Sequence, residues 1–248
     1  MSGLNASNFR RVHIGMLLDL ILLFLIPVLL AGLIVILINQ VSSTVVDIEA
    51  VTVADLIAKP TAAVQGIYVL IAMQYCLSAL CSLLVVSGLG ELESVSADLR
   101  RAKLWFMLLI MADGITMLGH LSDVMLTEGV LGSLTTALFF VAVLMMLVFH
   151  ALALRFLMRG YAGVLEGTGA PEMSRRIRAL ASRITVAAVV LVAMICAIFF
   201  MWLLNLTERI RVVLILPAIA SFAFHLVCRF QAVHCAKTVA RRITALSE

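Results

Sequence analysis

Runs of about 20 consecutive apolar residues recur along this chain, and few folds can accommodate them. A helix rises about 1.5 Å per residue, so a run of this length matches the roughly 30 Å hydrocarbon core of a bilayer. Hydrophobic residues make up 64% of the 248 residues and charged residues only 13%, and the mean hydropathy is +1.17. A soluble fold could not bury so much apolar surface, so the sequence predicts an all-α integral membrane protein.

Six transmembrane helices can be placed on these runs. Lipid offers no hydrogen-bond partner to free backbone groups, so the spanning segments must be helical. The first run follows Arg10 and Arg11 and lacks a small-residue cleavage site, so we expect it to remain as a span and not to be removed as a signal peptide. Residues 1–248 then form a single membrane domain. The predicted spans are residues 14–39, 63–88, 103–122, 132–157, 184–205 and 211–231.

Positive charge alternates between successive loops. Lysine and arginine cluster before the first span, between the second and third, between the fourth and fifth, and after the sixth. The other loops are poorer in positive charge, although Arg209 and Arg211 in the last of them are exceptions. Because cytoplasmic loops carry the excess of Lys and Arg, we expect both termini in the cytoplasm, with the chain in the plasma membrane. Topology therefore explains the basic residues, and no nucleic-acid partner is expected.

A short basic motif recurs before each odd-numbered span. The three copies read SNFRRVHIG, ADLRRAKLW and MSRRIRALA. The segment SGLGELESVSADLRRA also resembles RGYAGVLEGTGAPEMSRRIRA, which aligns Glu93 with Glu166. We interpret the chain as three helical hairpins over about residues 8–94, 97–166 and 173–240. The first outward loop, VVDIEAVTVADLIAKP, is typical of an amphipathic surface helix.

Two spans end in similar sequences, one in VFHALALRF and the other in AFHLVCRF. His150 and Arg155 end the fourth span, and His225 and Arg229 end the sixth. Two histidines at similar depth could clamp a b-type haem whose propionates bind the arginines. Alternatively, each arginine extends to the headgroups while each histidine bonds a neighbouring helix. We favour the structural interpretation.

Acidic and amide side chains within the spans are candidates for an ion or solute pathway, because such groups are costly in lipid. They are Asp113, Asp19 and Gln74. Asp19 lies near the cytoplasmic end of its span and could instead pair with Arg155 or Arg229. Asp113 lies deeper, beside Gly114 and Gly119, where glycine would let another helix approach closely. Its carboxyl group could serve an ion or proton site or form an interhelical hydrogen bond.

No motif assigns a chemistry to the chain. The five cysteines form no C-x-x-C pair, and there is no G-x-S-x-G turn, Walker loop or cluster of histidines for a metal centre. We therefore expect no enzyme activity, cofactor or metal. The sequence favours a non-catalytic subunit or scaffold of a membrane complex, surrounded by lipid and bound to other membrane subunits or to copies of itself. A small ion or solute channel or transporter is the alternative, and a b-type haem-binding subunit is a lesser one.

Overall fold

The computed structural model describes residues 5–44, 62–125, 132–203 and 208–247, and these residues form helices and short turns without any strand. The all-α fold is thus confirmed. The amphipathic segment predicted over residues 45–60 lies outside the described residues. The helices are α1 (Ala6–Thr44), α3 (Ala62–Leu92), α4 (Ala97–Met125), α5 (Gly132–Gly167), α6 (Pro171–Leu203) and α7 (Glu208–Ser247).

Over their described residues, five of these helices are long and apolar enough to cross a membrane. The candidate spans are Ala6–Ile36, Val69–Leu92, Phe140–Gly167, Pro171–Met201 and Leu216–Leu246. The exception is α4, which carries basic residues in its first turns and Asp113 further along. Several helices also continue beyond the predicted spans. For example, α7 runs to Ser247, whereas the predicted span ended at residue 231.

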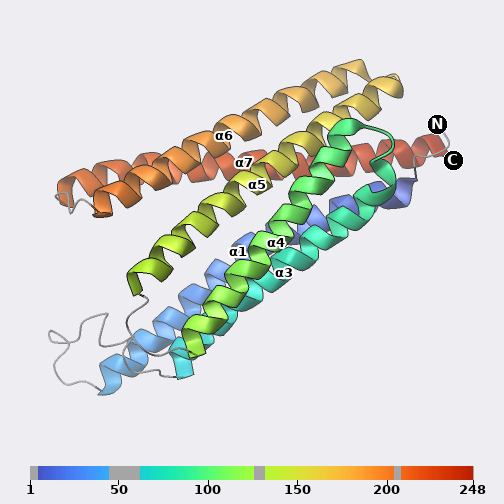
Figure 1. The fold of residues 1–248 in the computed structure, drawn as a ribbon. Helices are drawn as coiled ribbons and strands as arrows, with labels where there is room; N and C mark the ends of the chain where they lie inside the picture. Colours follow the sequence, from blue (N-terminus) through green and yellow to red (C-terminus); the bar gives the residue numbers. More distant parts are fainter. Residues whose placement is uncertain (1–4, 45–61, 126–131, 204–207, 248) are drawn as a thin grey trace.

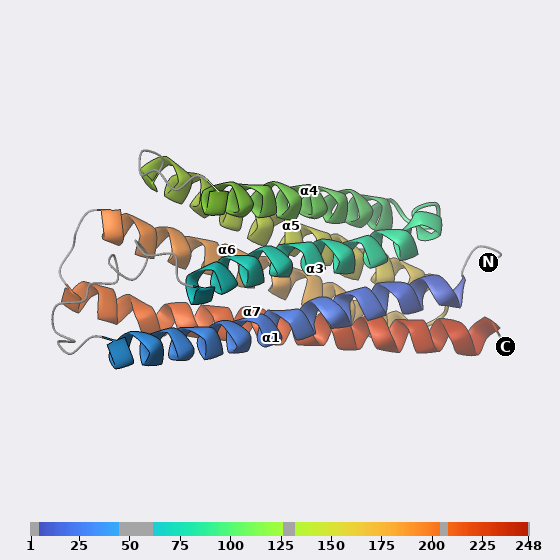
Figure 2. The same cartoon turned by 90° about the horizontal axis from the view of Figure 1, so that it is seen from below.

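The helices form a closed ring. Each packs against the next one in the chain, and α1 packs against α7 to complete the ring, while α5 also touches α7 (Figures 1 and 2). The start of α1, the end of α7 and the two short turns all lie at one end, which we call the terminal end (Figure 1). Away from that end, α6 and α7 diverge from α1, α3 and α4 in the same view.

The hydrophobic core lies near the terminal end, where the helices converge. Buried residues recur there every three or four positions, as in Phe9, Val12 and Met16 of α1. The rings of Phe9 and Tyr161, both fully buried, lie 5.5 Å apart. Farther from the terminal end, large apolar side chains are exposed, and Val28 is 68% exposed. Such wide apolar surfaces suit contact with lipid and not with water.

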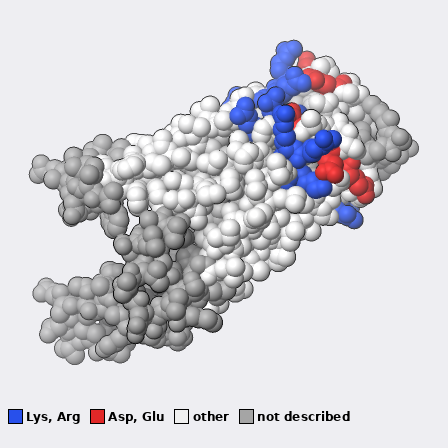
Figure 3. All heavy atoms as spheres, in the orientation of Figure 1, with Lys and Arg blue, Asp and Glu red and all other residues white. Residues whose placement is uncertain are grey.

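Charged side chains gather at the terminal end. In Figure 3, lysine, arginine, aspartate and glutamate side chains form a band near this end, and the remaining described surface of that face is uncharged. Asp98 at the start of α4 accepts contacts from Arg101 and Arg159, each at 3.6 Å. The bundle is therefore polar at one end and apolar along the rest of the face in view, as expected for a helix bundle that enters a bilayer.

Equivalent ion pairs cross the two turns at the terminal end. Lys103 Nζ of α4 lies 2.9 Å from Glu93 beyond α3, and Arg178 of α6 lies 2.5 Å from Glu166 of α5. These are the two glutamates that the internal alignment matched. The second turn is closed by Gly169, whose φ of 75° lies in the left-handed region, and the N–H of Ala170 bonds the carbonyl of Leu165. Pro171 then begins α6.

Glycines allow the closest helix contacts, but not the glycines that the sequence suggested. A Cβ on Gly15 of α1 would lie 2.7 Å from the carbonyl oxygen of Cys81 on α3, and one on Gly88 would lie 2.6 Å from that of Asn8. A Cβ on Gly114 meets nothing within 4 Å, so the expectation of a close helix contact there is wrong. The surroundings of Gly119 lie outside the described residues. Gly15 and Gly88 thus bring α1 and α3 into close contact.

Replacement of Gly15 by alanine should destabilise the bundle. The added methyl group would overlap backbone atoms of α3, so α1 must shift and the expected loss is about 1–3 kcal/mol of unfolding free energy. Equilibrium unfolding in mixed micelles measures this change. Gly114→Ala adds the same methyl group in open space and is the matched control. Equal stability of Gly15→Ala and Gly114→Ala would contradict the tight α1–α3 contact.

Candidate functional site

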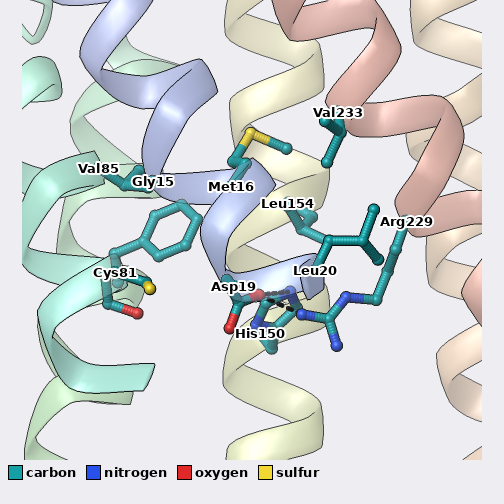
Figure 4. A pocket seen from close by; sticks show the side chains of 12 residues that line it. Gly15, Met16, Asp19, Leu20, Cys81, Val85, His150, Leu154, Arg229 and Val233 are labelled. Carbon is teal, nitrogen blue, oxygen red and sulfur yellow. Dashed lines mark hydrogen bonds and ion pairs between the residues drawn. The ribbon is translucent and has the colours of Figure 1, made fainter. Parts of the chain in front are cut away.

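A buried ion pair joins the first and last helices. Arg229 of α7 donates a hydrogen bond from its guanidinium to a carboxylate oxygen of Asp19 on α1, and both side chains are less than one-fifth exposed. His150 of α5 points toward the same carboxylate, with Nε2 3.9 Å from the oxygen (Figure 4). Of the two partners that the sequence left open for Asp19, the structure therefore has Arg229.

The ion pair lies away from the charged terminal end, farther along the helices. Asp19 follows Arg11 by eight residues, and Arg229 precedes Lys237 by eight, so each lies about 12 Å along its helix from those charges. A single charge at this depth would be costly in lipid. Pairing gives a neutral unit, and it does so at the contact where α1 meets α7 and the ring of helices closes.

A small cavity adjoins the ion pair in the middle of the bundle. Asp19, His150 and Arg229 line it together with Cys81 of α3 and Phe106 of α4, so five helices contribute to its wall. About 10 Å³ is open to the centre of a water molecule, which is room for about one water. Such a volume allows one water to bond the polar groups. It does not provide a continuous aqueous path.

Asp113 forms a separate polar contact between α3 and α4. The side chain is 2% exposed, and the hydroxyl of Ser78 on α3 hydrogen-bonds its carboxyl group. The second carboxyl oxygen, Oδ2, is buried with no hydrogen-bond partner in the described structure. Gln74, half-buried on α3, lies one helical turn from Ser78. The structure thus separates two of the three pathway candidates, with Asp19 in the ion pair and Asp113 in this second contact.

The two His-Arg pairs are not equivalent. Arg229 bonds Asp19, whereas Arg155 is half-buried and makes no hydrogen bond or ion pair among the described residues. His150 faces Asp19 and the edge of the Phe106 ring, 6.4 Å between centroids. His225 is 2% exposed, and its Nδ1 has no partner in the described structure. The cavity beside His150 is far too small for a porphyrin, and this geometry does not favour the haem interpretation.

One hydrogen bond between helices was not predicted from the sequence. The side-chain amide of Asn8 on α1 donates to Glu91 on α3 at 2.5 Å. Asn8 is 2% exposed, so this bond satisfies a buried polar group at the terminal end. Its signal in the sequence is weak, because an asparagine at the first turn of a helix is equally typical of a solvent-facing cap.

The comparisons give no relative for this arrangement. No family model, curated protein or solved structure matches the chain. Within the described parts of the chain, no group of three or more His, Cys, Asp or Glu side chains could hold a metal ion. The candidate site consists of the Asp19–Arg229 ion pair, His150 and the water-sized cavity.

Removal of one partner of the buried ion pair should cost more than removal of both. Asp19→Asn or Arg229→Met leaves one group without its compensating charge, and each should lower the unfolding free energy by about 3–5 kcal/mol. The double variant should recover much of that loss. Denaturation in mixed micelles measures the unfolding free energy of the wild type, the two single variants and the double variant.

Arg155→Met is the matched control, because Arg155 makes no ion pair in the described structure. It should cost less than Arg229→Met. Additive losses in the double variant would show that Asp19 and Arg229 are not coupled.

Proposed function

We propose that this chain is a non-catalytic, six-span membrane protein that serves as a subunit or scaffold of a membrane complex. The observation that carries this proposal is the neutral ion pair beside a cavity with room for about one water. Polar groups that bond one another hold helices together. They leave no charged group in this cluster free to act on a substrate.

The orientation and the sixth span belong to the same proposal. Basic residues at the terminal end favour its placement in the cytoplasm, with both chain termini there and the protein in the plasma membrane. The span that includes Asp113 is then formed by α4. Its basic first turns would lie at the headgroups, where Arg100, Arg101 and Lys103 suit the interface.

The diverging helices supply a surface for partners. Large apolar side chains of α1 and α7 stay exposed away from the terminal end, as Val28 and Leu216 do. Other membrane subunits, or further copies of this chain, could cover these faces by packing of apolar and small side chains. If the chain consists of three related helical hairpins, as the internal alignment suggests, the hairpins would offer similar surfaces to such partners.

Isolation in native nanodiscs should show the protein with other chains or as an oligomer. Polymer extraction keeps the surrounding lipid, and native mass spectrometry then reads the composition of each particle. A scaffold should give a defined complex that is larger than one chain. A homogeneous monomer with no co-isolated chain would contradict the scaffold proposal.

A small ion or solute passage is the second candidate, because Asp113 Oδ2 is a buried carboxyl oxygen without a partner in the described structure. If Asp113, Asp19 and Gln74 form such a path, proteoliposomes should show a flux that falls at least about tenfold in Asp113→Asn, since the charge that binds a cation is lost. The exposed Glu172→Gln is the control. Equal flux, or no flux, in wild type and Asp113→Asn would reject this passage.

A further inference from the structure

Two neighbouring grooves lie on the outer surface of the bundle and share one residue. The first, about 570 Å³, runs between α6 and α7 toward the terminal end, and Arg176, Arg183 and His234 line it. The second, about 410 Å³, lies between α1 and α7. Phe230 of α7 lines both, and its ring lies 5.7 Å from that of Phe24 on α1. The grooves therefore adjoin across one aromatic side chain.

The first groove combines positive charge with an apolar wall. Arg176 and Arg183 lie seven residues apart on α6, two turns or about 10 Å along one face. Both are exposed, and neither makes a hydrogen bond or ion pair among the described residues. Leu180 and Phe230 complete the wall beneath them. Two unpaired guanidinium groups above apolar side chains form a site for an anion that carries a hydrophobic body.

The second groove supplies room for that body. Each of its lining residues is apolar, including Phe24, Leu25 and Val28. Its α1 residues lie about 16–33 Å along that helix from Ala6, and Arg176 and Arg183 lie about 8 and 18 Å along α6 from Pro171. Most of this groove therefore lies deeper along the bundle than the arginines do. Phe24 is about 27 Å along α1 from Ala6. A molecule with its charge at the arginines and its apolar part beyond Phe230 would thus follow the direction of a bilayer lipid.

We propose that these two grooves bind an anionic phospholipid. Its phosphate lies between Arg176 and Arg183, with His234 beside it, and an acyl chain passes Phe230 into the α1–α7 groove. Charge complementarity selects the anionic headgroup over a zwitterionic one, whose ammonium group the arginines repel. The apolar groove selects a lipid over an acidic peptide, because it offers no hydrogen-bond partner to a peptide backbone.

Native mass spectrometry of the purified full-length chain tests this site. The protein is titrated with phosphatidylglycerol, with phosphatidylcholine of the same acyl chains, and with glycerol 3-phosphate. The double variant Arg176→Gln, Arg183→Gln should bind phosphatidylglycerol about thirtyfold more weakly than wild type, since each arginine near a membrane surface contributes about a fivefold preference for anionic lipid. Phosphatidylcholine should bind weakly to both proteins.

The double variant Arg175→Gln, Arg241→Gln is the matched control. It removes two exposed arginines from the same end but from outside both grooves, and it should retain phosphatidylglycerol as wild type does. Equal weakening in the two double variants would overturn the site, because general surface charge would then explain the binding. All of the replaced arginines are exposed, so gel filtration should show both variants folded.

The length of the acyl chain tests the second groove. Long-chain phosphatidylglycerol should bind more tightly than the six-carbon form, and Leu25→Trp, which fills the groove, should reduce that difference. Glycerol 3-phosphate that competes as well as the lipid would overturn the proposal in favour of a free phosphate site. A co-purified protein that is lost from Arg176→Gln, Arg183→Gln, with lipid binding unchanged, would overturn it in favour of a protein partner.

Discussion

The hydrocarbon core of a bilayer offers no hydrogen-bond partners, and this constraint limits where polar groups can lie in a chain that enters it. Backbone groups are satisfied within long helices. Charged side chains gather at the terminal end (Figure 3), and the two acidic side chains that lie deeper have partners inside the bundle. Asp19 meets Arg229 and His150, while Asp113 meets Ser78. The polar contacts consequently link α1 with α7 and α3 with α4.

Packing density follows a gradient along the bundle. At the terminal end, Gly15 and Gly88 bring α1 against α3, and large buried side chains such as Tyr161 fill the centre. Farther along, the helices diverge and their apolar side chains are exposed. In water such exposure would be strongly unfavourable, but lipid tails are as apolar as leucine, so in a bilayer the hydrophobic effect would not draw these helix faces together. Stability is thus concentrated near the terminal end.

The sequence predicts helix positions better than side-chain partners. Apolar runs identify the helices because hydropathy and length are local properties, and charge alone limited the partner of Asp19 to two arginines. Other expectations depended on helix rotation, which a local pattern does not determine. Gly114 faces open space, whereas Gly15, with no special neighbours in the sequence, contacts α3. Likewise Arg155 and Arg229 end similar segments, yet Arg229 faces Asp19 and Arg155 does not.

Adjacent residues on α7 connect the buried ion pair with the proposed lipid site. Successive helix positions differ by about 100° in direction, so Arg229 can turn inward to Asp19 while Phe230 turns outward into both grooves. The ion pair holds α7 against α1, and that contact forms the walls of the α1–α7 groove. A lipid bound there would touch both helices only when the ring is closed. Its binding energy would therefore add to the stability of ring closure, because a ligand stabilises the conformation that it binds.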